Sequence, residues 1–234
     1  MRIRSLPTAS LLACLICLAC ITSAPAAQTA PKDPFARLFG YEALVAGQED
    51  FPLHIKKYWL MVIKAERDAP CLQGATCLQQ LDAVQWRNLA GKARTMDETE
   101  LLRAVNAFCN KYPAGQDEKY GHRDRWPIPA DLFDRRAGDA KAFALAKYFA
   151  LRALNIPEEK LRIVLAYLPE RKAAHAVLAA ATNKGVFILD NDVRPLDLVL
   201  PQDNFLSRYI PLLMFNEKGR WTFGQNMEVL GVQR

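Results

Sequence analysis

The sequence lacks the features that mark metal-binding, membrane-spanning and nucleic-acid-binding proteins. Its three histidines include His54 and His122, which stand at no spacing typical of metal ligands, so no metal cluster is expected. No apolar run after residue 26 approaches the ~20 residues that a membrane-spanning helix needs. The net charge of +6 comes without a basic stripe interleaved with aromatic residues, which argues against a nucleic-acid partner. No internal repeat is present.

The first 26 residues have the layout of a secretory signal peptide. Arg2 and Arg4 form a short positive region, residues 11–21 are apolar, and Ala24-Pro25-Ala26 provides a small-residue cleavage site. This pattern predicts a periplasmic or secreted protein. Lipoprotein anchoring through one of the cysteines of this segment is the alternative.

Removal of that segment leaves three cysteines, Cys71, Cys77 and Cys109. In an oxidising compartment the short spacing between Cys71 and Cys77 predicts a local disulfide. A loop this small would fix a turn rather than stabilise the whole fold. Cys109 falls within an apolar helical pattern, which indicates a buried structural thiol rather than a reactive one.

The first half of the chain is predicted to be helical. Residues 27–52 show no clear period and are predicted to form a loose N-terminal arm. Apolar residues at helical spacing predict helices over 53–67 and 78–90. Thr95 and Glu98 form a capping-box pattern that opens a third helix, ending near Tyr112. Residues 113–137 are predicted to form a long loop.

The second half combines one buried helix with a sheet. Asp139 is predicted to cap a helix that runs to about Leu154 and is apolar on both sides, as expected for a helix at the centre of a domain. The later segments 161–167, 175–180, 186–190, 209–215 and 220–223 have the composition of strands. Helices followed by an antiparallel sheet define an α+β fold, with residues 53–234 as a single domain.

A buried helix followed by strands carrying a histidine and an aspartate is the ground plan of papain-like thiol enzymes. The first turn of such a helix stabilises a thiolate, an adjacent imidazole shares its proton, and a carboxylate orients the imidazole. His175 and Asp190 have the right residue types, but the helix begins with Ala140. Taken singly, each also fits an ordinary strand histidine and a turn aspartate.

The chain resembles the bacterial transglutaminase-like cysteine peptidases, whose best-known members are periplasmic proteases that release large adhesins. The resemblance covers about residues 95–223. The positions that carry it, in order, are Ala104-Val105-Asn106, Tyr120-Gly121, Asp124-Arg125-Trp126, Pro129, Ala137-Gly138-Asp139, Lys147, His175-Ala176-Val177-Leu178 and Leu189-Asp190-Asn191.

The resemblance implies a papain-like core and a catalytic triad of which one member is missing. The family's helix opens Gly-Asp-Cys-Glu-Asp, so the nucleophile position is Ala140, while His175 and Asp190 match the other two members. Adhesin-releasing members bind calcium through acidic residues around this turn. Lys141 and Ala142 replace the acidic pair, which predicts loss of that calcium site and no cofactor.

The sequence therefore predicts a catalytically inactive relative that binds a polypeptide or an envelope regulator. Trp126 and Asp139 are predicted to line the former substrate cleft together with His175. Two alternatives remain open: a hydrolase of altered mechanism, in which His175 and Asp190 activate water or Cys109 reaches the site, and a purely structural envelope protein. Ser207 lies at no helix start and is not a replacement nucleophile.

Overall fold

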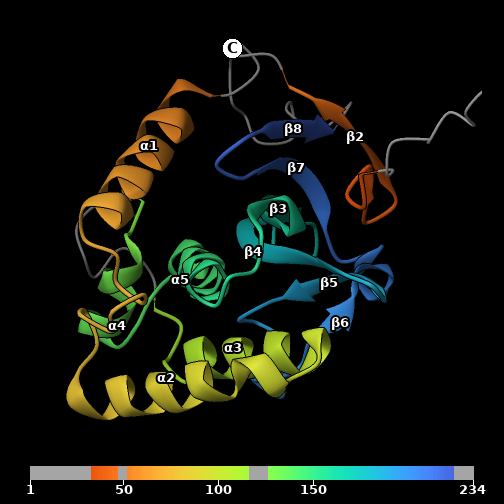
Figure 1. Ribbon diagram of the computed structural model, residues 1–234. Coiled ribbons are helices and arrows are strands. Elements are labelled where there is room, and N and C mark those ends of the chain that lie inside the picture. The colour runs from red at the N-terminus through yellow and green to blue at the C-terminus, as the bar shows by residue number, and fades with distance from the viewer. Residues whose placement is uncertain (1–32, 47–51, 116–125, 224–234) are drawn as a thin grey trace, which may run out of the picture. The chain divides into compact units, whose positions relative to one another are not determined.

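The computed structural model describes residues 33–46, 52–115 and 126–223. These residues belong to one compact unit. After two short strands, helices precede the rest of an antiparallel sheet, so the predicted α+β fold is confirmed (Figure 1). None of the helices in the described ranges is long and apolar enough to cross a membrane.

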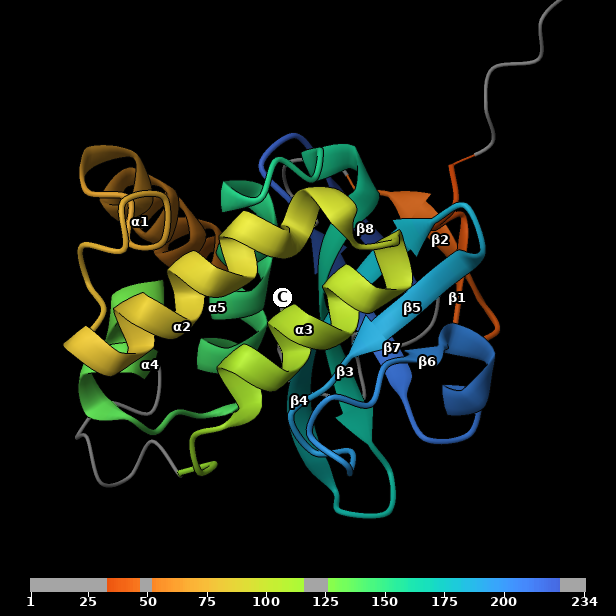
Figure 2. The same cartoon turned by 60° about the horizontal axis from the view of Figure 1, so that its bottom comes forward.

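The predicted N-terminal helices are present with small shifts at their ends. They are α1 (Leu53–Asp68), α2 (Gln80–Lys92) and α3 (Glu98–Asn110). Each buries one side, on which α1 and α2 also carry the buried carboxylates Glu66 and Asp82. Figure 2, which turns the view of Figure 1, shows α2 and α3 crossing in front of the rest of the fold.

The capping box of α3 lies two residues further along than predicted. Asp97 accepts a hydrogen bond from the Glu100 N–H at 2.8 Å, and the Glu100 carboxylate accepts one from the Asp97 N–H at 3.1 Å. Thr95 instead donates its hydroxyl to the Lys92 carbonyl, at 2.9 Å, within a 3-10 turn. Thr95–Glu98 and Asp97–Glu100 both have the spacing of a capping box. Thr95 still lies within the 3-10 turn, whereas Asp97 has the extended backbone of a helix cap.

The segment 113–137 is not loop throughout. Helix α4 (Pro129–Arg135) begins with proline at its first position, where no backbone N–H is needed. The Asp131 carboxylate accepts a hydrogen bond from the Ile128 N–H at 2.9 Å, which closes the helix start. Residues 116–125, which include Tyr120 and His122, lie outside the described residues.

Helix α5 (Ala140–Ala153) forms the centre of the fold, as predicted. Most of its residues from Ala142 to Leu151 are buried, because α3 and α4 cover it on one side and strands β3 and β4 on the other. Asn155, in left-handed conformation at φ 66°, ends the helix ahead of Pro157.

Eight strands form one antiparallel sheet in the order β1-β2-β8-β7-β3-β4-β5-β6. The predicted strands correspond to β3 (Leu161–Leu168), β4 (Ala173–Thr182), β5 (Gly185–Leu189), β7 (Ile210–Phe215) and β8 (Arg220–Phe223), and β6 (Leu200–Pro201) adds a short edge strand. Alternate residues pack on opposite faces. Ala176 and Leu178 join a core cluster with α5, whereas Val177 and Ala179 join a second cluster on the other face.

Residues 33–46 are not the loose arm that the sequence predicts. They form β1 (Arg37–Leu38) and β2 (Tyr41–Val45), and β2 pairs with β8. Phe35, Leu38 and Phe39 are buried in the second core cluster. Strands this short show no alternation of apolar and polar residues, so their burial was not visible in the sequence.

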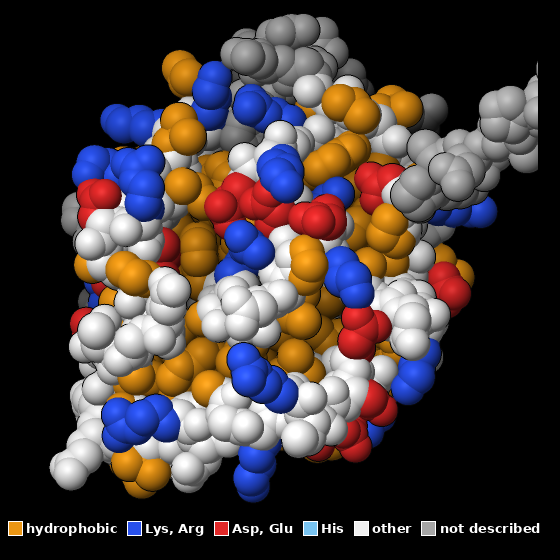
Figure 3. Space-filling model, viewed as in Figure 1, with side chains coloured by type: hydrophobic (Ala, Val, Ile, Leu, Met, Phe, Trp, Pro, Cys, Tyr) orange, Lys and Arg blue, Asp and Glu red, His pale blue; other side chains and the backbone are white. Residues whose placement is uncertain are grey.

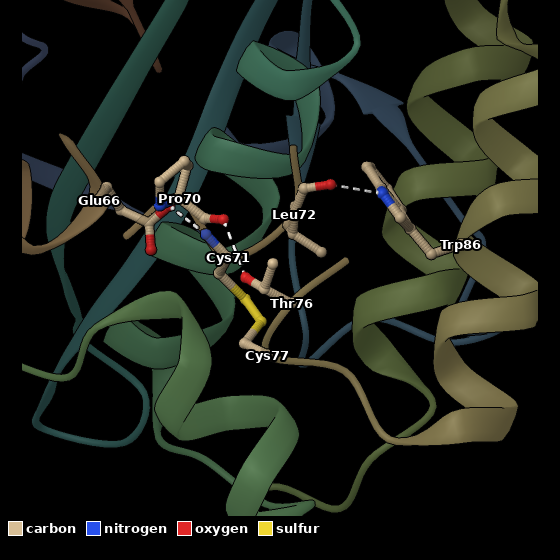
Figure 4. The surroundings of a disulfide bond; sticks show 7 residues. All are labelled: Glu66, Pro70, Cys71, Leu72, Thr76, Cys77 and Trp86. Carbon is tan, nitrogen blue, oxygen red and sulfur yellow. Dashed lines mark hydrogen bonds between the residues drawn. A yellow bond between two sulfur atoms is a disulfide. The ribbon is translucent and has the colours of Figure 1, made fainter. Parts of the chain in front are cut away.

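The predicted disulfide between Cys71 and Cys77 is present in the loop after α1 (Figure 4). The buried Glu66 carboxylate accepts a hydrogen bond from the Cys71 N–H at 3.3 Å, and Trp86 donates its indole N–H to the Leu72 carbonyl at 2.7 Å. The loop thus connects α1 to α2. Cys109 is a free, fully buried thiol, as expected.

Surface charge is of mixed sign on the face seen in Figure 3, where acidic side chains gather near the middle with Lys or Arg side chains among them. Ion pairs such as Lys218–Glu158, at 2.6 Å, and Arg152–Glu217, at 3.4 Å, join charges of opposite sign. This face offers no extended single-sign patch of the kind that binds nucleic acid.

Candidate functional site

The turn before α5 brings the backbone into close contact with the helix. A Cβ atom added to Gly138 would lie 2.7 Å from the Ala142 Cβ and 2.9 Å from Leu132 Cδ1. Such contacts are too short for any residue but glycine. The Gly138 carbonyl also accepts a hydrogen bond from the Gly115 N–H at 2.9 Å. This tight turn fixes where α5 begins.

Asp139 and Ala140 form the start of α5, in agreement with the prediction. The Asp139 carboxylate caps the helix by accepting a hydrogen bond from the Ala142 N–H at 2.9 Å. Ala140 is the first helical residue and is only partly buried. Its methyl group therefore stands at the positive end of the helix dipole, where a thiolate or other anion would be stabilised.

The two residues after Ala140 leave little capacity for a cation at this turn. Lys141 forms an ion pair with the second carboxylate oxygen of Asp139, whose first oxygen already caps the helix. Ala142 is buried and has no side-chain oxygen. Among the described residues, no group of three or more histidine, cysteine or acidic side chains is placed to hold a metal ion. These residues do not fit a hard divalent cation, which needs several oxygen ligands.

His175 and Asp190 are brought together, as the sequence predicted. His175 lies near the start of β4 and Asp190 directly follows β5, the neighbouring strand. The imidazole Nε2 lies 2.8 Å from Asp190 Oδ1. The two side chains are 10% and 1% exposed, so their pairing is shielded from water.

Asp190 is held as a carboxylate. Burial by itself would raise its pKa, but the contact with His175 and hydrogen bonds from the Tyr209 hydroxyl and the Asp192 N–H outweigh burial and lower the pKa to about 2. A carboxylate only accepts hydrogen bonds, so the proton shared with His175 resides on Nε2. Nδ1 is then the nitrogen that remains for an incoming group.

Three residues that support this pair were not identified from the sequence. Asn110, on α3, donates its amide to the Asp190 carbonyl at 2.8 Å. The Tyr209 hydroxyl donates to Asp190 Oδ2, and Arg208 Nε donates to that hydroxyl at 3.1 Å. Nothing in the local sequence marks these residues, because their roles arise only when separate segments meet.

Helix α5 packs against β4, the strand that carries His175. Ala140 borders the core cluster that contains Ala176, the residue after His175. By strand alternation the His175 side chain leaves β4 on the opposite side from Ala176. The assignment of Ala140, His175 and Asp190 to one triad therefore rests on the family pattern, while the structure itself shows the His175–Asp190 pair.

Trp126 lies in the core rather than on an open surface. It is 8% exposed, and its ring centroid lies 5.5 Å from that of Phe215. Little of the ring is therefore available to stack on a ligand. Its predicted part in a substrate cleft stays a prediction.

The remaining candidate residues lie outside the His175–Asp190 pair. Burial raises the pKa of the Cys109 thiol to about 12. Lys147, also fully buried on α5, has its pKa lowered by burial to about 8 and donates to the Leu189 carbonyl at 3.5 Å. His54 is exposed on α1, and Ser207 is exposed in the turn before β7.

A central helix capped at a tight turn and packed on a sheet that carries a His–Asp pair defines the class of papain-like, transglutaminase-like folds. Residues 69–223, more than half of the chain, match the family model of the bacterial transglutaminase-like cysteine proteinases. The chain belongs to this family.

Solved structures support the same assignment. The chain is similar to LapG from Legionella pneumophila, with 25% identity, a TM-score of 0.51 and coverage of 73% of this chain and 92% of that one. A calcium-bound structure of LapG gives 23% identity and the same TM-score, over 72% and 87% of the two chains. Among curated proteins no match was found.

Proposed function

We propose that this chain is a non-catalytic member of its family that binds a polypeptide, either a segment of an envelope protein or a regulator. The observation that carries the proposal is Ala140 at the first position of α5, where the family's nucleophile stands, in a chain that keeps the His175–Asp190 pair. A methyl group cannot attack a carbonyl carbon. Losing the nucleophile of a well-studied serine protease reduces its rate about a millionfold.

Neighbouring residues supply no substitute. A thiol with a pKa near 12, as buried Cys109 has, is almost entirely protonated at neutral pH, and the thiolate is the reactive form. Ser207 has no imidazole shown to activate it, and it lies in a turn rather than at a helix start. These facts weigh against a relocated nucleophile.

The retained groups suit recognition. The first turn of α5 places the positive end of the helix dipole at Ala140, and the oriented imidazole of His175 offers Nδ1. Groups of this kind hydrogen-bond to the carbonyl and carboxylate groups of a peptide. The signal-like first 26 residues favour a periplasmic or secreted location for such an interaction.

We also propose that calcium is not a cofactor of this chain. Both carboxylate oxygens of Asp139 are already engaged, one by the Ala142 N–H and one by the Lys141 ammonium. A cation at this turn would have to displace Lys141. The expected result is no change in the melting temperature of the mature chain when calcium is added or chelated.

The direct test is a peptidase assay of the mature chain on a peptide library and on candidate adhesins. We expect no cleavage, and the His175→Ala variant should give the same blank result. Cleavage that disappears in His175→Ala would overturn the proposal. It would favour the second reading, in which the His175–Asp190 pair activates water.

A reversal tests whether the site geometry persists. If Ala140 and His175 form one site, as the family pattern implies, the new thiol of Ala140→Cys should have a lowered pKa, seen as alkylation by iodoacetamide that persists well below pH 8. The double variant Ala140→Cys, His175→Ala is the matched control and should lose most of this reactivity at low pH. Buried Cys109 and the Cys71–Cys77 disulfide keep the background low. Equal pH profiles for the two variants would show that Ala140 and His175 do not form one site.

A further inference from the structure

The His175–Asp190 pair is part of a larger hydrogen-bonded ring. We propose that Tyr209 is the positioning residue for His175, acting through its ring on the imidazole and through its hydroxyl on Asp190, and that Arg208 orients that hydroxyl. This role goes beyond the proposed function, because it concerns how the imidazole is held whether or not the chain cleaves a substrate.

The Asp190 carboxylate is fixed through both of its oxygens. Oδ1 contacts His175 Nε2 at 2.8 Å and accepts the Asp192 N–H at 2.9 Å, and Oδ2 accepts the Tyr209 hydroxyl. A carboxylate held by only one oxygen can rotate about its terminal torsion, which is broad. The Tyr209 hydroxyl removes that freedom and keeps Oδ1 directed at the imidazole.

Arg208 completes the ring. Its Nε donates to the Tyr209 hydroxyl at 3.1 Å, and its terminal nitrogen pairs with Asp192 Oδ2 at 2.7 Å. The Tyr209 oxygen therefore accepts from Arg208, and its own proton is directed to Asp190. The sequence of contacts Asp190–Tyr209–Arg208–Asp192 returns to Asp190 through the Asp192 N–H. Each residue of this ring restrains the orientation of the next, so the ring as a whole holds the Asp190 carboxylate in one orientation.

The Tyr209 ring supports the imidazole from one side. The two ring planes are 17° apart with centroids at 5.9 Å. Phe205 lies nearly parallel to Tyr209 as well, at 5.4 Å and 17°, and Phe39 contacts it at 5.2 Å. Tyr209 is 1% exposed. The imidazole therefore rests on a packed aromatic stack instead of moving freely at the strand end.

Strand register explains why these residues meet. On β3, Ala166 pairs with His175 on one side and with Pro211 on the other. Tyr209 lies two residues before Pro211, so by strand alternation its side chain points to the same face of the sheet as that of His175. Asp190 reaches the same place from the end of β5.

The test is the tautomer of His175 measured by long-range ¹H–¹⁵N NMR on the mature chain with its natural Ala140. His175→Ala identifies the signals among the three histidines. In Tyr209→Phe the ring stays and the hydroxyl is lost, so Asp190 Oδ2 loses this donor while the Asp192 N–H still holds Oδ1. The carboxylate can then turn away from the imidazole, and we expect the preference of His175 for the Nε2–H tautomer to weaken.

Tyr112→Phe is the matched control, because the Tyr112 hydroxyl also donates to a buried carboxylate, that of Asp82. It should lower thermal stability without moving the His175 signals. A Tyr209→Phe protein whose melting temperature falls while the tautomer signals of His175 stay unchanged would show a structural role only, and would overturn the proposal.

A second pair of variants decides the question if Tyr209→Phe does not fold. Arg171 and Arg208 each pair with Asp192 at 2.7 Å, but Arg208 also donates to Tyr209. Arg208→Gln and Arg171→Gln each remove one positive charge that pairs with the Asp192 carboxylate. We expect the weakened tautomer preference of His175 only in Arg208→Gln. Equal effects of the two variants would contradict the orienting role of Arg208.

Discussion

Single atoms determine what this site can do. Ala140 places a methyl group at the start of α5, while the carboxylate of Asp190 keeps three defined contacts, to His175, Asp192 and Tyr209, and its backbone carbonyl accepts a fourth from Asn110. Under the proposed function, the polar partners of the imidazole are retained although the reactive atom is absent. A site that had only drifted after losing its nucleophile has no physical need for buried charge, which is costly unless it is fully hydrogen-bonded.

The lowered pKa of Asp190 gives a prediction at this scale. Its pKa is about 2 in the folded chain and near 4 when unfolded, so it stabilises the fold above pH 4, and this contribution is lost as pH falls from about 4 to 2. We expect Asp190→Asn to cost about 2 kcal/mol of unfolding free energy at pH 7 and much less at pH 2.5. Urea unfolding at both pH values measures the difference.

Asp68→Asn is the control for this experiment. Asp68 also has a lowered pKa, caused first by its hydrogen bond with Lys64, but its side chain is 48% exposed. A pair of this kind contributes little to stability because water and salt screen it. An Asp190→Asn effect that is small and independent of pH, like that of Asp68→Asn, would mean that Asp190 is not a buried carboxylate held by its partners.

At the scale of elements, a buried glutamate, Glu66, connects α1 to the disulfide loop. Burial raises the pKa of Glu66 to about 7, and the single hydrogen bond from the Cys71 N–H only partly opposes this (Figure 4). Here the folded pKa lies above the unfolded value, so the native state binds its proton more tightly. Stability is therefore lost as pH rises from about 4.5 to 7 and stays lower above that range.

Glu66→Gln should remove this penalty, because the amide oxygen can still accept from Cys71 without carrying charge. We expect the variant to be more stable than the natural chain by about 3 kcal/mol at pH 8 and nearly equal to it at pH 4.5. Thermal unfolding at the two pH values tests this. Lower stability of Glu66→Gln at pH 8 would indicate that the carboxylate has a cationic partner in the folded chain.

How far the elements could be predicted depended on whether their signals were local. Helix α5 was found from the Asp139 cap and its apolar sides, and His175 and Asp190 from residue type and order. Helix α4 is too short for its single buried side to show a period, and Pro129 at its start is the one local signal of a helix there. Tyr209 acquires its role only through strand register, which no local pattern encodes.

At the scale of the whole molecule, the first described residues of the chain support the site. Strand β2 extends the sheet beyond β8, and Phe39 packs against Tyr209 and Phe205. The Phe39 N–H also donates to Gln202 Oε1 at 2.9 Å, across most of the sequence. Residues 33–46 thus connect the start of the chain to the aromatic stack beneath His175, and the sheet and the site form one cooperative structure.

Phe39→Ala tests this connection. Phe39 is 1% exposed, so truncation should cost about 3 kcal/mol or more through lost burial and the cavity left behind. It should also loosen Tyr209, which would broaden the imidazole NMR signals of His175. Tyr41→Ala, on neighbouring β2 and 37% exposed, is the control and should cost less than about 1 kcal/mol. If both variants unfold at the same denaturant concentration as the natural chain, residues 33–46 are the dispensable arm that their sequence suggests, and the stack holds His175 without them.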